Sequence, residues 1–180
     1  QLEVALYEYG KSILSSESGW IRQIVPLSTD LDKISEELFA LKTDGGDEYC
    51  GWVIKDAVER LAWSKVPADL KAVFIAGNEP FTQGQTDYRQ SCKAAVQAGI
   101  AVNTIHCGPE AAGISGQWRD GAVVGDGQFM NIDQNKAIRH ISTPQDPLIA
   151  ELDAKLNATY VPYGALGEQG RARQVEQDAN

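Results

Sequence analysis

The sequence predicts an α/β fold: a doubly wound, mostly parallel sheet with helices on both faces. Apolar runs of strand length alternate along the chain with amphipathic segments of helix length. The run over residues 72–76 is apolar throughout, as in a parallel strand that is central and covered on both faces. A helical stripe and a further apolar run follow it, which together predict a strand–helix–strand crossover.

The first part of the chain is expected to hold two strands and two helices. Alternating apolar residues predict a strand over residues 2–9 and a shorter one over 21–27, at a sheet edge because it contains Pro26. Asp30 precedes an amphipathic helix that Gly45-Gly46 ends. A second helix is expected over about residues 48–63, with Ile54 and Ala57 on its apolar face.

The second part is expected to continue the alternation. Tyr88, Cys92, Ala95 and Val96 form the inner stripe of a helix that ends at Gly99. Strands are predicted over residues 100–105 and 128–133, with a short helix over 118–124 between them. A last helix begins at Asp146-Pro147, and the polar composition of residues 164–180 indicates a tail or linker.

Composition excludes several classes of protein. The 180 residues carry 16 basic and 25 acidic side chains, a formal charge of -9, so a nucleic-acid-binding role is not expected. No apolar run reaches the roughly 20 residues of a membrane span, and no signal peptide is recognised at the start. The three cysteines do not suggest a disulfide framework or a zinc site, and the expected crossover geometry keeps Cys92 and Cys107 too far apart to bond.

Ligands of such sheets bind at the carboxyl ends of the strands. These ends carry Tyr9-Gly10, Gly77-Asn78-Glu79-Pro80, His106-Cys107-Gly108 and Asp133, joined by the loop over residues 43–48. Function is therefore sought at this edge of the sheet.

Several segments, in this order and spacing, resemble a von Willebrand factor type A (VWA) domain of the bacterial stand-alone kind. They are the opening strand, Val25-Pro26-Leu27 with Thr29-Asp30, Gly45-Gly46-Asp47-Glu48, Leu61-Ala62-Trp63, Phe74 to Pro80, Val102 to Ile105 with Cys107-Gly108, and Thr159 to Gly164. The resemblance implies a VWA-like domain over residues 1–163. It also implies Mg²⁺ at the top of the sheet, completed by an acidic group of a protein partner.

The sequence departs from that family at the metal site. No Asp-x-Ser-x-Ser motif is present, because the chain begins where the family's second strand would be, with the first strand and its helix missing. The resemblance places Asp47 and Asn78 as ligands of a weak or absent Mg²⁺, and an amide oxygen such as that of Asn78 binds Mg²⁺ less well than a carboxylate. With a central strand missing, residues 1–180 are expected to be an incomplete fold that self-associates.

Other interpretations of these residues remain open. Asp47 and Glu48 suit the cap of the following helix better than a ligand role. His106 and Cys107 are more readily structural residues than catalytic ones, since neither has an identifiable catalytic partner. Trp52, Trp63 and Trp118 suit packing, whereas Trp20 lies in a turn and is expected to be exposed. His140 lies in a polar connection and indicates little.

The sequence favours a non-enzymatic module that binds an unknown protein partner through Asp47, Glu48, Asn78 and Glu79. One alternative is a hydrolase-like enzyme that uses Glu79, His106 or Cys107 in the same crevice. The other is a structural spacer of a longer exported protein. A periplasmic or extracellular location is implied by the resemblance alone.

Overall fold

The computed structural model describes residues 1–42, 45–133, 135–136, 142–164 and 166–178. The chain divides into two compact units, Gln1–Lys136 and Ala137–Asn180. The elements expected to form a sheet all belong to the first unit.

The first unit opens with an antiparallel hairpin of β1 (Val4–Tyr9) and β2 (Ile21–Ser28). Tyr9 lies opposite Ile21, and the register shifts twice between Val4 and Tyr7. The connection contains the short 3₁₀ helix η1 (Ser16–Ser18), which the sequence did not predict. Glu8 is buried in β1, where its carboxylate pairs with Lys11 and Arg22.

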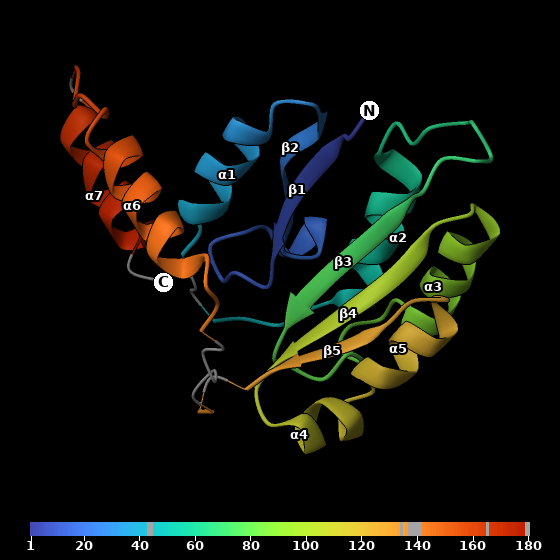
Figure 1. Ribbon diagram of the computed structural model, residues 1–180. Helices are drawn as coiled ribbons and strands as arrows, with labels where there is room; N and C mark the ends of the chain where they lie inside the picture. The colour runs from blue at the N-terminus through green and yellow to red at the C-terminus, as the bar shows by residue number, and fades with distance from the viewer. Residues whose placement is uncertain (43–44, 134, 137–141, 165, 179–180) are drawn as a thin grey trace. The chain divides into compact units, whose positions relative to one another are not determined.

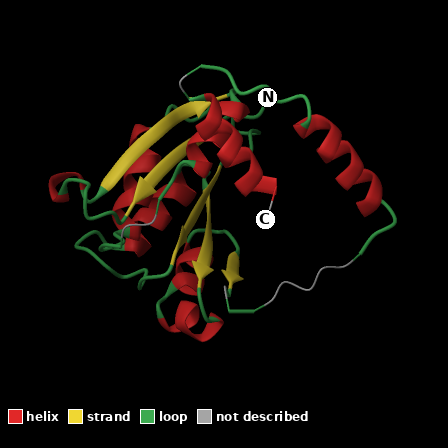
Figure 2. Cartoon of the chain, turned by 90° about the vertical axis from the view of Figure 1, so that its left-hand side faces the viewer, coloured by secondary structure: helices red, strands yellow, loops and turns green. Residues whose placement is uncertain are grey.

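A second sheet contains three parallel strands in the order β3 (Ala72–Gly77), β4 (Ala101–Cys107) and β5 (Phe129–Ile132). Their register pairs Ile75 with Thr104 and His106 with Asn131. Figure 1 shows the three strands side by side, and Figure 2 shows the strands of the two sheets as separate yellow groups. Together with the helices, this arrangement confirms the predicted α/β class.

Helices α2 (Cys50–Arg60), α3 (Tyr88–Gln97) and α5 (Trp118–Val124) pack against one face of the strands. Their apolar stripes meet the strand residues that point the same way, such as Ile75 and Val102. The predicted stripe of α3 is confirmed at Tyr88, Cys92 and Ala95, whereas Val96 is exposed. A short helix, α4 (Glu110–Ser115), follows β4 and was not predicted.

Helix α1 (Leu31–Phe39) confirms the predicted amphipathic helix and its Asp30 cap, but it ends at Phe39, before Leu41 and the predicted stop at Gly45-Gly46. The Asp30 carboxylate accepts a hydrogen bond from the Lys33 amide at 2.9 Å. No residue of α1 is buried, and Leu31, Leu38 and Phe39 are each about half exposed. The helix therefore depends on its own caps and ion pairs more than the other helices of this unit do.

The expectation that residues 72–76 form a central strand covered on both faces is wrong for the described residues. β3 lies at the edge of its sheet, with β4 as its one strand partner there. Ile75 is buried, but Phe74 is 66% exposed and Ala76 is also exposed. An apolar run indicates that both faces of a strand are able to be buried. Whether both faces are covered depends on the elements that pack beside the strand.

The second unit contains α6 (Asp146–Asn157) and α7 (Gly167–Asp178). α6 begins at the predicted Asp146-Pro147, and the Thr143 amide donates to the Asp146 carboxylate. The region expected to be a tail or linker instead contains α7, because Glu, Gln, Arg and Ala favour a helix even without an apolar face. Among the described residues, no helix is long and apolar enough to cross a membrane.

Candidate functional site

The carboxyl ends of β1 and β3 lie together with the loop before α2. The Tyr9 hydroxyl donates to the Ala76 carbonyl at 2.7 Å, which joins the last residue of β1 to the end of β3. Glu48 reaches the same place from the loop. We call Asp47, Glu48, Gly77, Asn78, Glu79 and Gln83 the strand-end site.

The Glu48 carboxylate fixes the turn that follows β3. Its Oε2 accepts hydrogen bonds from the amides of Asn78 at 3.1 Å and Glu79 at 3.3 Å. Gln83 holds the other side, because its Oε1 accepts from the Glu48 amide at 2.7 Å and its Nε2 donates to Glu79. A closed ring of hydrogen bonds therefore joins the loop before α2 to the turn after β3.

The predicted capping role of these acids is wrong. The N-cap of α2 is Tyr49, without a side-chain hydrogen bond to the helix. The Glu48 side chain is bonded instead to amides at the end of β3, which are distant in sequence and nearby in space. The sequence near Glu48 shows only the free amides at the start of α2, so it favours a cap. The free amides of Asn78 and Glu79 come close to Glu48 only in the folded chain.

Gly77 makes room for this carboxylate. A Cβ at position 77 would lie 2.2 Å from the Glu48 Oε2 and 2.8 Å from the Tyr9 hydroxyl oxygen. Both distances are far below van der Waals contact, so a side chain here would displace the carboxylate. The glycine is required by close approach, since its backbone is not in the left-handed region.

Partial burial raises the pKa of Glu48 above its ordinary value of 4.5. The amides of Glu79 and Asn78 oppose this shift because they stabilise the anion, while the nearby Glu79 charge adds to it. Folding therefore makes Glu48 easier to protonate than in the unfolded chain.

Trp118 and His106 form the buried support beneath the site. The Trp118 indole donates to the Glu79 carbonyl at 2.8 Å, and its ring lies 5.8 Å from that of His106. His106 is 2% exposed, and its Nδ1 lies 3.1 Å from the Asn131 side-chain oxygen. These contacts agree with the structural interpretation of His106 and with the packing role expected of Trp118.

The cysteines are free thiols. Cys50 is buried and lies 3.8 Å from the Tyr9 hydroxyl, while Cys107 is partly exposed. Burial raises the pKa of the Cys107 thiol, and the negative charge of Glu48 raises it further. Cys107 is thus a weaker nucleophile at neutral pH than a free cysteine.

The predicted binding residues divide into two groups. Glu48 and Glu79 are partly buried and hold the turn, whereas Asp47 and Asn78 are exposed. Trp20 was expected to be exposed, but it is partly buried and its ring packs edge to face on Tyr49 at 5.0 Å. Thr43 and Asp44 of the expected loop, and His140, lie outside the described residues.

The residues present do not fit a Mg²⁺ site. The Glu48 oxygen nearest the turn already accepts two amides, and Asn78 offers a neutral oxygen. Among the described residues, no group of three or more His, Cys, Asp or Glu side chains is placed to hold a metal ion. A hard divalent cation needs several converging oxygens, which this arrangement does not supply.

Sequence reasoning placed Tyr9 and Gly77 at strand ends without giving either a role in the site, and it did not single out Gln83. The glycine that closes the apolar run of β3 was a usable signal, because glycine after a strand often marks a close approach. Nothing local distinguishes Gln83 from an ordinary loop residue.

Solved structures share this arrangement of elements. The protein BatB of Bacteroides thetaiotaomicron aligns over 87% of this chain and 80% of its own, with 13% identity and a TM-score of 0.54. The SpRpn10 VWA domain aligns over 87% of this chain and 71% of its own, with 16% identity and a TM-score of 0.53. The chain has a VWA-like fold.

At these identities the likeness extends to the fold alone. No family model matches the sequence, and no curated protein matches it by sequence. The function of this VWA-like domain is therefore inferred from its own residues.

Proposed function

We propose that this VWA-like domain is a non-enzymatic module that binds a protein partner through the strand-end site, without requiring Mg²⁺. The ring of hydrogen bonds around Glu48 carries the proposal. It joins the loop before α2, where Asp47 is exposed, to the turn after β3, where Asn78 is exposed, so the contact surface is ordered before the partner arrives. The exposed carboxylate of Asp47 favours a partner with basic side chains.

The alternative of a hydrolase is less well supported by the same residues. His106 is buried and its Nδ1 contacts Asn131, so it is poorly placed to activate a nucleophile. The raised pKa of Cys107 leaves little thiolate at neutral pH. Glu79 accepts from Gln83 and helps to hold the turn.

Pull-down with matched variants tests the binding proposal. The double variant Asp47→Ala, Asn78→Ala removes exposed side chains at the site, whereas Asp69→Ala and Lys93→Ala change exposed residues elsewhere. Proteins captured by the unaltered chain and by both controls, but lost with the double variant, are expected. Equal capture by all four proteins would count against the strand-end site.

Calorimetric titration with Mg²⁺ and Mn²⁺ tests the metal side of the proposal. The unaltered protein is expected to bind weakly or not at all, because its oxygens are few or already engaged. Asn78→Asp adds a carboxylate and is expected to strengthen any weak affinity by about tenfold. Low-micromolar binding by the unaltered protein would contradict a metal-independent site.

A further inference from the structure

Three partly exposed aromatic side chains, Trp20, Tyr49 and Trp52, gather beside the strand-end site. The Trp20 ring packs edge to face on that of Tyr49 at 5.0 Å. Trp52 packs against Gly19, where a Cβ would lie 2.5 Å from the indole Cδ2. The Tyr49 ring packs in the same way on Gly84, where a Cβ would lie 2.7 Å from its Cγ. We call Trp20, Tyr49 and Trp52 the aromatic cluster.

The aromatic cluster adjoins the exposed Asp47 of the strand-end site through Gly10. The Gly10 amide donates to the Trp20 carbonyl at 3.0 Å, and a Cβ on Gly10 would lie 3.6 Å from the Asp47 carbonyl oxygen. Tyr49 lies two residues after Asp47 in the chain. A carboxylate and several aromatic rings therefore lie together at this end of the sheet.

Trp20 has an unusual backbone conformation. Its φ of +54° lies in the left-handed region, which bulky side chains rarely adopt. The turn holds it there, because its amide donates to the Ser15 carbonyl at 3.0 Å. Backbone outliers of this kind concentrate at positions that contact ligands, so Trp20 is a candidate contact residue.

The aromatic cluster holds no cation of its own. Among the described residues, no basic side chain lies over any of its three rings. The basic residues nearest to the turn, Lys11 and Arg22, both pair with the buried carboxylate of Glu8. The rings and Asp47 are therefore open to a cation from another molecule.

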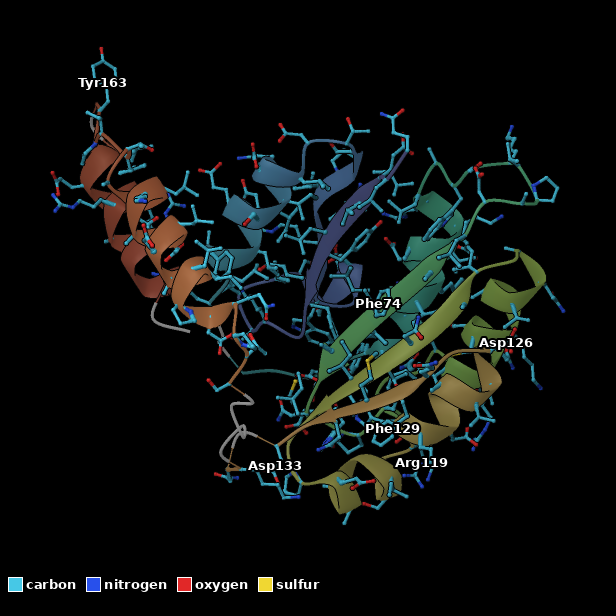
Figure 3. The ribbon with its side chains drawn as sticks, in the orientation of Figure 1. Phe74, Arg119, Asp126, Phe129, Asp133 and Tyr163 are labelled. Carbon is cyan, nitrogen blue, oxygen red and sulfur yellow. The ribbon has the colours of Figure 1, made fainter. Side chains whose placement is uncertain are left out.

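Arginine binds to aromatic rings elsewhere in this chain. The Arg89 guanidinium carbon lies 4.9 Å from the centre of the Tyr88 ring, and its Nε pairs with Asp120 at 3.0 Å. Arg119 lies over the Phe129 ring at 5.4 Å, and Figure 3 labels both side chains. A planar guanidinium can stack on a ring while its N–H groups donate to a carboxylate.

Given the partner-binding function proposed above, on which this step depends, we propose that the aromatic cluster and Asp47 bind an arginine side chain of the partner. The guanidinium stacks on the rings of Trp20 and Tyr49 and donates to the Asp47 carboxylate. Lysine fits less well, because its ammonium is compact, strongly hydrated and unable to stack as a plane. The net charge of -9 attracts a basic partner over longer distances.

The indole N–H signals of the NMR spectrum test this assignment, because they report on each tryptophan separately. The probes are N-acetyl-arginine amide and N-acetyl-lysine amide, added to dilute protein. They are raised to about 50 mM, since a single side chain should bind no more tightly than about 1 mM. Trp20→Phe assigns the Trp20 signal. Trp63, whose indole donates to the Ala57 carbonyl at 2.9 Å, is the internal control.

The arginine derivative is expected to shift the Trp20 signal until it saturates and to leave the Trp63 signal in place. The lysine derivative is expected to bind about threefold more weakly. No saturable shift of Trp20, an equal shift of Trp63, or equal affinity for the two derivatives would each overturn the assignment of arginine.

A matched pair of acidic residues tests the carboxylate. Asp47→Asn keeps the shape of the side chain and removes its charge, and it is expected to weaken binding of the arginine derivative about threefold. Glu59→Gln, at an exposed position of α2, is expected to leave the affinity unchanged. Equal affinities of these two variants would overturn the role of Asp47.

Competition in the pull-down separates this proposal from the binding function itself. A partner that is lost with Asp47→Ala, Asn78→Ala should also be displaced by the arginine derivative. Failure of the derivative to displace it would overturn arginine as the bound side chain and leave the strand-end site supported. Saturable binding of the derivative, with equal capture by all pull-down variants, would instead contradict the partner-binding function alone.

Discussion

At the scale of single residues, Glu48 joins the two segments that form the strand-end site. Its carboxylate occupies the space that Gly77 leaves free and binds two amides at the end of β3. Because burial raises the pKa of this carboxyl group, the folded protein holds a proton on Glu48 at a pH where the unfolded chain has lost it.

The stability of the protein should depend on pH through this residue. The stabilising contribution is fully present below the ordinary pKa of 4.5 and is lost as the pH rises through the raised pKa of the folded state. Glu48→Gln removes the ionisable carboxyl group. The difference in unfolding free energy between the unaltered protein and Glu48→Gln should therefore change between pH 4.5 and the raised pKa of Glu48, and should be constant above that pKa. Urea unfolding followed by tryptophan fluorescence measures this, with the exposed Glu59→Gln as control. A constant difference from pH 4 to pH 8, roughly the range of these ionisations, would refute the assignment.

The thiols should differ in reactivity. Cys50 and Cys92 are fully buried, and burial raises the pKa of Cys92 to about 12. A thiol reagent at neutral pH should therefore modify Cys107 alone in the folded protein, more slowly than a free thiol. Ellman titration of the unaltered protein and of Cys107→Ser checks this. Rapid modification of two cysteines without denaturant would show that the core opens more readily than its packing indicates.

At the scale of elements, the helices differ in what stabilises them. α2 and α3 bury several residues each, whereas α1 buries none. A helix without a buried face is stabilised mainly by its caps and its own side-chain pairs. Lys33 forms ion pairs with Glu36 and Glu37 within α1, and the Asp30 cap is a further local support.

Removing that cap should loosen α1 without unfolding the sheet. Asp30→Ala leaves the Lys33 amide without its acceptor and is expected to cost about 1 kcal/mol, seen as faster amide exchange within α1. Asp30→Asn should restore slow exchange, since asparagine caps nearly as well. Unchanged exchange in both variants would mean that contacts with the hairpin, and not the cap, fix the helix.

At the scale of the whole molecule, unpaired edges and an uncovered apolar face predict association. In the described part of the chain, β1 has no strand partner on the edge away from β2, and β3 has none on the edge away from β4. The side chain of Phe74 on β3 is also exposed. Such edges and faces promote pairing between copies.

Residues 1–180 alone are therefore expected to form oligomers or aggregates as concentration rises. Size-exclusion chromatography with light scattering measures this. A sharp monomer peak from the unaltered chain, with one cooperative thermal transition, would contradict the expectation.

The predicted elements that proved right are those with a local cause. Asp30 begins α1, Pro147 lies in the first turn of α6, and the stripe of Tyr88, Cys92 and Ala95 faces the core. Capping, fixed φ and helical spacing act within a few residues, so a single sequence records them. The order of such elements was also sufficient for the α/β class.

Tertiary structure alone decided the rest. Whether the apolar run of β3 has one covered face or two depends on elements distant in sequence. By sequence, Glu48 was expected to cap α2. In the folded chain its carboxylate instead accepts hydrogen bonds from the amides of Asn78 and Glu79, in the space left by the missing side chain of Gly77. The sequence by itself determined the class of fold and the end of the sheet where its polar residues gather. The partners of those residues were decided by three-dimensional packing, because a hydrogen bond between positions 30 residues apart has no local signature.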